Sequence, residues 1–481
     1  MKLKSNFQSL VPGAKDSGEV LEVVAPFDGE VIGSIGYAGP ETVEKALSLA
    51  AQLHASPESR LPVWERIAIL NRTADLLEER AEDFALESAR EGGKPLGDSR
   101  VEVARAVDGI RTCAEVLRTQ SGEEIPMGIS PSSAHRLAFT THEPIGPVLA
   151  FSAFNHPLNL IVHQAVPAVA CGCPVVVKPA SDTPLSCFRL VELLHEAGLP
   201  EEWCQAVVVK DRNLATSMAS DSRVAFLTFI GSGNVGWMLR SKLAPGTRCA
   251  LEHGGAAPVV MDQSADLDQA VPLLAKGGYY HAGQVCVSVQ RVFAPPAMLP
   301  ELAERIAAEA AKMTVGDPTL AETGIGPLIR PREADRIEEW IKEAVDGGAA
   351  CPLNGARVSS SCQEPVILVD PPADCRVSQQ EIFGPVICLY SAASMDEAIK
   401  AANAVPYSFQ AAVFSRELDP ALKAFKLLDA KTVMMNDHTA FRVDWMPFGG
   451  LNESGLGVGG ISHTMNDMQV EKSLIIHSKN L

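Results

Sequence analysis

Three segments of the sequence carry side chains that together could perform covalent acyl chemistry. Cys286 lies in GQVCVSVQR, Glu252 precedes the glycine pair of LEHGGAAPVVM, and Asn155 follows a strand-like run in FSAFN. A thiol nucleophile, a carboxylate base and an amide that stabilises an oxyanion are the groups that such chemistry needs. A cysteine in an apolar run is, taken alone, more often part of the core. Because the sequence does not show that the three segments converge, the catalytic interpretation needs further support.

A fourth segment has the spacing of a phosphate-binding turn. Gly231, Gly233 and Gly236 form G-x-G-x-x-G between the strand-like VAFLTFI and the helical WMLRSKL. Glycines at these positions let the backbone approach a pyrophosphate, which a helix N-terminus then stabilises. A tight turn without a ligand explains the motif alone nearly as well, but its position between a strand and a helix favours a dinucleotide. Glu252 stands at about the distance where a Rossmann acid would bind ribose, although we expect a different role for it.

The elements around these segments predict two α/β domains. Residues 40–120 carry apolar residues at helical spacing. From about residue 144, short apolar runs alternate with helical stretches, which is the pattern of βαβ units in a parallel sheet. A second series runs from about 255 to 440, with strands expected in APVVM, QRVFA, PVILV, PVICLY, QAAVFS and VMMN. The C-terminal EKSLIIHSKNL is expected to be a strand whose partners lie elsewhere in the fold or in another subunit.

Composition and charge narrow the class of protein. A chain of 481 residues exceeds what one ordinary domain packs around a single core, and 46% hydrophobic with 21% charged residues is typical of soluble globular proteins. The net charge of −18 argues against nucleic acid and anionic membranes as partners. We expect no membrane span, no signal peptide and a cytoplasmic protein. The eleven cysteines lack metal-ligand spacing, so we expect no metal site and interpret Cys171 and Cys173 as packed thiols.

A joint pattern of short segments identifies a family. Seven of them stand in the order and approximate spacing of the aldehyde dehydrogenase superfamily: EHGGAAP, GQVCVSVQR, FNHP, KPAS, FIGSGNVG, QEIFGP and MPFGG. The sequence resembles this family from about residue 20 to its C-terminus. The resemblance implies an α/β fold with a Rossmann-like cofactor domain (1–122 and 144–251), a catalytic domain (252–450) and a small β oligomerisation element (123–143 and 451–481). It also implies a homodimer or homotetramer.

The resemblance implies a role for each residue that matches a family motif. Cys286 would attack the aldehyde carbon, and the Asn155 amide with the Cys286 backbone N–H would stabilise the oxyanion. Glu252 would activate the water that hydrolyses the resulting thioester. The hydride would pass to the cofactor, NAD or NADP. The residues that match the cofactor site of the family are Lys178, Ser181, Phe154, Gly231, Ser232, Gly236, Glu381 and Phe383.

Two of these cofactor positions depart from the common pattern. Ser181 stands where many relatives have an acidic residue that binds the 2′-hydroxyl of NAD. Since serine does not repel a 2′-phosphate, we expect NADP to be accepted as well as NAD. Phe154 stands where many relatives have Trp, which removes one N–H donor to the diphosphate.

The positions that match the substrate tunnel of the family carry basic side chains. Relatives that oxidise apolar aldehydes have aromatic residues there, whereas this sequence has Arg105, His156, His163 and Arg442. Each arginine alone is better interpreted as an exposed residue. Four basic residues at tunnel positions together favour a dianionic head group, because arginine makes bidentate contacts to phosphate-like and carboxylate oxygens. The segment NDHTAFRVDWMPFGG most resembles the phosphonoacetaldehyde dehydrogenases, which implies oxidation of phosphonoacetaldehyde to phosphonoacetate. Val285, before the nucleophile, argues against a sugar phosphate.

Other interpretations stay open. An aldehyde that bears a carboxylate, sulfonate or phosphate, such as succinate semialdehyde, would suit the same cations. A catalytically silent binding protein on the same fold is the non-enzymatic alternative, against which the intact Cys286, Glu252 and Asn155 argue. A CoA-acylating relative would commonly lack the base that Glu252 supplies. We therefore expect a hydrolytic, NAD(P)-dependent aldehyde dehydrogenase that acts on a small anionic aldehyde.

Overall fold

The short apolar runs that follow residue 144 form a mostly parallel sheet. The computed structural model describes residues 5–481, and its six-stranded sheet has the order β22-β10-β9-β6-β7-β8. All neighbours in this sheet are parallel except β22 and β10. The four predicted runs are β6 (Val148–Phe151), β7 (Val175–Lys178), β8 (Cys204–Ala206) and β9 (Phe226–Ile230). Strands covered on both faces form continuous apolar runs, which is why the sequence reveals them.

Helices pack on both faces of this sheet. Along β6, Val148 and Ala150 belong to the core under α4, α5 and α6, whereas Leu149 and Phe151 belong to the core under α1, because successive strand residues point to opposite faces. The helices of this unit are α1 (Pro40–Ala55), α2 (Val63–Glu79), α3 (Ala81–Gly92), α4 (Leu96–Thr119), α5 (Asn159–Cys171), α6 (Leu185–Glu196), α7 (Arg212–Ser220) and α8 (Gly233–Arg240).

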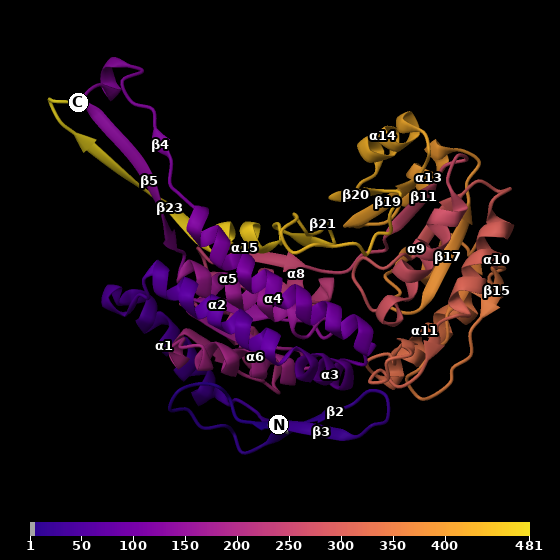
Figure 1. The fold of residues 1–481 in the computed structure, drawn as a ribbon, viewed down its shortest axis with the longest axis horizontal. Helices are drawn as coiled ribbons and strands as arrows, with labels where there is room; N and C mark the ends of the chain where they lie inside the picture. Colours follow the sequence, from indigo (N-terminus) through magenta and orange to yellow (C-terminus); the bar gives the residue numbers. More distant parts are fainter. Residues whose placement is uncertain (1–4) are drawn as a thin grey trace.

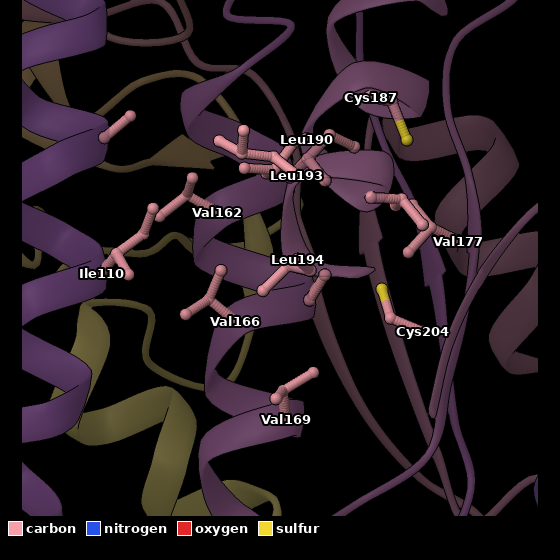
Figure 2. Close-up of a cluster of buried hydrophobic side chains, with 14 of the residues drawn as sticks. Ile110, Val162, Val166, Val169, Val177, Cys187, Leu190, Leu193, Leu194 and Cys204 are labelled. Atoms are coloured by element: carbon pink, nitrogen blue, oxygen red, sulfur yellow. The ribbon is translucent and has the colours of Figure 1, made fainter. Parts of the chain in front are cut away.

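Helix α5 is the central helix of this unit, and all 13 of its residues are buried. A helix that is apolar on every side is buried among other elements. In Figure 2, Val162, Val166 and Val169 of α5 lie between Ile110 of α4 and the leucines of α6. Because α5 begins four residues after Asn155, this packing fixes where Asn155 can lie.

The second predicted series forms a seven-stranded sheet of order β15-β16-β17-β12-β11-β19-β20. All six runs predicted from the sequence are strands here, which confirms that part of the prediction. The strands are β11 (Pro258–Met261), β12 (Arg291–Ala294), β15 (Ala350–Asn354), β16 (Val366–Val369), β17 (Val386–Ser391), β19 (Gln410–Phe414) and β20 (Thr432–Met435). The helices are α9 (Leu267–Tyr279), α10 (Leu299–Ala310), α11 (Pro331–Asp346), α12 (Arg376–Gln379), α13 (Met395–Ala402) and α14 (Leu418–Leu427).

Three strands form an arm that projects from the first unit (Figure 1). They are β4 (Glu124–Ile125), β5 (Arg136–Pro144) and β23 (Gln469–His477), and β23 pairs with β5 antiparallel over nine residues. The partner of the predicted C-terminal strand therefore lies in the same chain. Near the N-terminus, β1 (Asn6–Phe7), β2 (Val20–Val24) and β3 (Val31–Gly36) form a separate small sheet.

The segment before β23, which the prediction grouped with 123–143 in the oligomerisation element, pairs with strands outside the arm. Strand β21 (Leu451–Asn452) pairs with β18 (Tyr407–Ser408), and β22 (Gly455–Leu456) pairs with β10 (Arg248–Glu252). Helix α15 (Ile461–Asp467) packs against α5, because its apolar Ile461 and Met465 are fully buried there. The buried thiols of Cys171 and Cys173 donate to carbonyls in this region, as packed thiols do. Within residues 5–481, no helix has the length and hydropathy of a membrane span.

Candidate functional site

The three candidate catalytic residues, far apart in the sequence, line one cavity. Its volume is about 1070 Å³, and both α/β units contribute to its walls. Asn155, Glu252 and Cys286 all line it, as do Lys178 at the end of β7 and Ile230 at the end of β9. A crevice at the carboxyl ends of parallel strands is the usual ligand site of an open α/β sheet. The size of the cavity suits a small organic ligand.

Asn155 and the loop that carries Cys286 are tied together by a hydrogen bond. The Asn155 amide Nδ2 donates to the backbone carbonyl of Gln284 at 3.0 Å. Gln284 is itself fixed, because its Oε1 accepts from the Ile329 N–H at 2.9 Å and its Nε2 donates to the Pro327 carbonyl at 3.2 Å. One N–H of the Asn155 amide is used in this bond, so the other is available for a substrate oxygen.

The turn before the nucleophile has an unusual backbone. His281 and Ala282 have φ values of 47° and 52°, in the left-handed region that non-glycine residues rarely adopt. Both residues are buried, and a Cβ on the following Gly283 would lie 2.0 Å from the Gly384 carbonyl oxygen. Tight packing therefore holds a strained turn directly before Cys286, as is common at functional sites.

The electrostatic surroundings of Cys286 favour the neutral thiol. Burial raises its pKa well above the usual range, and the carboxylates of Glu252 and Glu381 raise it further, while Arg442 opposes them. Burial also raises the pKa of Glu252, again opposed by Arg442. A carboxylate with a raised pKa can remove a proton near neutral pH. The pair can therefore convert a resting thiol into a nucleophile when Glu252 accepts its proton.

Glu381 provides a test of whether the cavity suits a dinucleotide. Its Oε1 is buried and has no hydrogen-bond partner in the described part of the chain, and burial raises its pKa to about 8. Such an oxygen needs a donor, and a ribose hydroxyl is one. Lys178, Ser232 and Phe383 line the same cavity, and Ser232 lies at the start of α8. The residues therefore fit the expected cofactor.

Two predicted cofactor residues lie outside the cavity wall. Ser181 does not line the cavity, although its neighbours Ala180 and Asp182 do. Gly236 does not line it either. A Cβ at Gly236 would lie 2.0 Å from the His253 Cε1, so this glycine makes room for an imidazole. His253, which the sequence analysis missed, has its Nδ1 2.9 Å from the Gly231 carbonyl oxygen and so supports the glycine turn.

Three of the four predicted basic substrate residues, Arg105, His156 and Arg442, line the cavity, and their surroundings differ. Arg105 forms a bidentate pair with Asp444, with Nε and Nη2 at 3.0 and 2.7 Å from the carboxylate oxygens. His163 is buried, does not line the cavity, and has its Nε2 2.6 Å from Asp444. Burial lowers the pKa of His156. Burial and the nearby Arg442 lower the pKa of His163 to about 4. Both imidazoles are therefore neutral near pH 7.

Arg442 is the tunnel residue whose charge is not balanced by an ion pair. Its guanidinium lines the cavity and lies over the Phe448 ring, with Cζ 3.6 Å from the ring centroid. Nη2 lies 3.4 Å from the His163 Nδ1, and Nε is buried without a partner among residues 5–481. The Asp444 carboxylate was missed by the sequence analysis, although an acidic residue beside Arg442 in FRVDW was a visible signal.

Comparisons with known proteins identify the family of the chain. The model described as "Aldehyde dehydrogenase family" matches residues 13–474. A 3-sulfolactaldehyde dehydrogenase of Priestia aryabhattai is 35% identical over 461 residues, which cover 96% of each chain. This relative does not support the predicted closeness to phosphonoacetaldehyde dehydrogenases.

Solved structures agree with the predicted fold. Aldehyde dehydrogenase 21 of Physcomitrella patens, in complex with the reaction product succinate, has a TM-score of 0.94 at 33% identity over 99% of both chains. Glyceraldehyde-3-phosphate dehydrogenase of Methanocaldococcus jannaschii, complexed with NADP, has a TM-score of 0.91 at 32% identity, covering 95% of this chain and 99% of the other. These similarities confirm the predicted α/β fold.

Proposed function

The chain belongs to the aldehyde dehydrogenase family, and we propose that its substrate is a small aldehyde whose head group carries one negative charge, a sulfonate or a carboxylate. The reaction is the NAD(P)-dependent oxidation of an aldehyde to the acid. The observation that carries the substrate class is Arg442. It lines the cavity with its charge uncompensated by an ion pair, and its Nε lacks a partner within residues 5–481.

The charge count at the tunnel favours a monoanion. Among the four predicted substrate residues, Arg105 is neutralised by Asp444 and both histidines are neutral, so Arg442 is the one that keeps a positive charge outside an ion pair. A desolvated cation is stabilised by a paired anion, and one cation matches one negative charge. Arg105 also lines the cavity and retains Nη1 outside its bidentate pair, so it offers a further N–H donor without adding net charge.

The comparisons support this choice of head group. The relative named a 3-sulfolactaldehyde dehydrogenase acts on a sulfonate, and the solved structure with succinate holds a carboxylate product. A phosphonate, which carries up to two charges, would need a second unpaired cation. Phosphonoacetaldehyde is therefore the less favoured substrate, and it serves as a comparison in the test below.

In the proposed mechanism, the residues of the chain perform the proton transfers and hold the oxyanion. Glu252 removes the proton of the Cys286 thiol, and the sulfur attacks the carbonyl carbon. The Asn155 amide and the Cys286 backbone N–H donate to the oxyanion. Bound NAD or NADP supplies the hydride acceptor. After the thioester has formed and the first proton has passed from Glu252 to solvent, Glu252 removes a proton from the water that attacks the acyl carbon, and this proton passes to the Cys286 sulfur as it leaves.

The cofactor would be held by residues on both units. Glu381 presents an unpartnered carboxylate oxygen that suits a ribose hydroxyl. Lys178, whose Nζ donates to the adjacent Pro179 carbonyl at 3.3 Å, can also donate to a hydroxyl of the second ribose. The turn at Gly231 and Ser232 leads into α8 and would receive the diphosphate, because a helix N-terminus favours anions.

The test compares kcat/KM for sulfoacetaldehyde, succinate semialdehyde, phosphonoacetaldehyde and butanal. The formation of reduced cofactor measures each rate. We expect the two monoanions to be preferred over butanal. Arg442→Met should lower kcat/KM for the monoanions by about a hundredfold, since truncating one partner of a buried charged contact costs several kcal/mol. Arg100→Met, on the surface of α4 and half exposed, is the matched control. Turnover of butanal equal to that of the monoanions, or an equal loss for all four aldehydes in Arg442→Met, would overturn the proposal.

A further inference from the structure

Arg442 lies on a loop, where a long side chain needs neighbours to hold it in one conformation. Fixing an arginine side chain costs up to about 2 kcal/mol of conformational entropy. The Phe448 ring supports one face of the guanidinium, and the His163 Nδ1 lies near its edge. We propose that His163 and Asp444 are positioning residues that orient Arg442 toward the anionic end of the substrate, an inference that rests on the proposed function.

The hydrogen-bond directions in this group follow from the chemistry of arginine. A guanidinium has donors and no acceptor, so the Arg442 Nη2 donates and the His163 Nδ1 accepts, at 3.4 Å. The proton of the neutral imidazole must then be on Nε2, which donates to the Asp444 Oδ1 at 2.6 Å. The chain of donors runs from Arg442 through His163 to Asp444. This assigns one tautomer to His163 and one rotamer range to Arg442.

These two hydrogen bonds, from Arg442 to His163 and from His163 to Asp444, require a neutral imidazole at His163. The short contact with Asp444 alone would favour a protonated imidazole. Burial, Arg442 and Arg105 act in the opposite direction and hold the pKa of His163 at about 4. A protonated ring would have an N–H at both nitrogens and could not accept from Arg442. Both hydrogen bonds are therefore present at neutral pH.

Asp444 is itself held by several donors, so it can serve as the fixed end of the chain. Arg105 on α4 binds both of its oxygens, and the Asn159 Nδ2 on α5 lies 3.2 Å from Oδ1. Burial opposes ionisation of Asp444, but the hydrogen bonds from His163 and Arg105 outweigh it and keep its pKa below the usual range. Asn159 and His163 are four residues apart on α5 and share one face. Two packed helices thus determine where the loop residue Arg442 points.

His163 does not line the cavity, and this separates positioning from direct binding. A residue that touches substrate would affect every aldehyde that reaches it. A residue that acts through Arg442 would affect only aldehydes whose binding uses the guanidinium. The two roles therefore predict different results for an anionic and a neutral substrate of similar length.

The experiment uses His163→Phe, which keeps a ring but removes both nitrogens. We expect the KM for succinate semialdehyde to rise about tenfold, since hydrogen bonds to charged groups are the stronger kind. The kcat and the KM for butanal should change less than about twofold, because butanal has no anionic group to meet the guanidinium and the positive charge of Arg442 is kept in this variant. His163→Gln should restore the KM to within about threefold of the original, because an amide can accept from Arg442 and donate to Asp444.

Two further variants keep the test decisive. Val166→Ala, one turn along α5 and fully buried, is the control for general loosening of the helix, and it should leave the preference for the anionic substrate unchanged. His163→Leu replaces His163→Phe if thermal unfolding shows that the larger ring is not accommodated. An unchanged KM for succinate semialdehyde, or an equal rise for butanal, would overturn the positioning role.

Arg442→Met, measured in parallel, separates this inference from the proposed function. If Arg442→Met abolishes the preference for the anion while the His163 variants retain it, only the positioning role fails. If Arg442→Met itself retains the preference, the proposed substrate class fails first.

Discussion

A buried ion pair next to Asn155 couples the stability of the first unit to catalysis. Lys94 and Glu102 have side chains that are 0% and 1% exposed, with Nζ and Oε2 2.5 Å apart. The other oxygen of Glu102 accepts the backbone N–H groups of Leu158 and Asn159, at 3.1 and 2.9 Å. These N–H groups belong to the first turn of α5, directly after Asn155. Glu102 therefore holds the segment that presents the catalytic amide.

Replacing Lys94 with methionine removes the counter-ion and leaves a buried carboxylate. Breaking a buried pair in this way costs about 3–5 kcal/mol, whereas an exposed pair contributes about 0–1 kcal/mol. In the double variant Lys94→Met/Glu102→Gln the remaining amide is neutral and its oxygen can still accept from the backbone. We expect the double variant to lose less stability than Lys94→Met alone, because no uncompensated charge stays buried. The kcat of Lys94→Met should fall by about tenfold or more, since small displacements of a catalytic group are costly.

The assay is urea unfolding of the holoenzyme together with initial rates at saturating substrate. The matched control is Lys210→Met, because Lys210 pairs with Glu19 on the surface and both side chains are more than 60% exposed, at 65% and 61%. That variant should lose less than about 1 kcal/mol. The reasoning would be refuted if Lys94→Met lost no more stability than Lys210→Met, or if the double variant were less stable than Lys94→Met.

Four other predictions concern the reaction and the binding of the cofactor. Cys286→Ser should abolish formation of reduced cofactor while leaving cofactor binding, measured by fluorescence titration, unchanged; retained turnover would exclude Cys286 as the nucleophile. Glu252→Gln should accumulate acyl-enzyme, detected by intact-protein mass, and normal hydrolysis would exclude Glu252 as the base. Because burial raises the pKa of Glu252, the rate of thioester hydrolysis in the original enzyme should fall as pH decreases through that raised value, and a rate that rises on acidification would contradict this. Gly236→Ala should raise the KM for the cofactor several-fold, since its Cβ would meet the imidazole of His253; an unchanged KM would show that the turn can adapt.

The sequence by itself determined the elements whose signal is local. The runs that became β6, β7 and β9 are continuous and apolar because both faces of their sheet are covered. The candidate catalytic residues were also recognisable, since each lies in a short motif whose residue types suit its chemistry. The order of the motifs along the sequence indicated a known family, and the three residues do line one cavity. Local residue patterns and the order of the motifs can be recognised in the sequence without knowledge of the long-range packing.

Only the tertiary structure decided the charges of the tunnel. Arg105 and Asp444 are 339 residues apart, and His163 and Asp444 are 281 apart, so no local pattern predicted that the carboxylate would neutralise one arginine. The protonation state of His163 depends on burial and on a cation from a distant loop. The position of helix α15 is likewise set by its packing against α5. The sequence gives the residue types of the tunnel. The net charge of the tunnel, the tautomer of its histidine and the orientation of its arginine arise from contacts between distant segments, and these properties determine which substrate the site can hold.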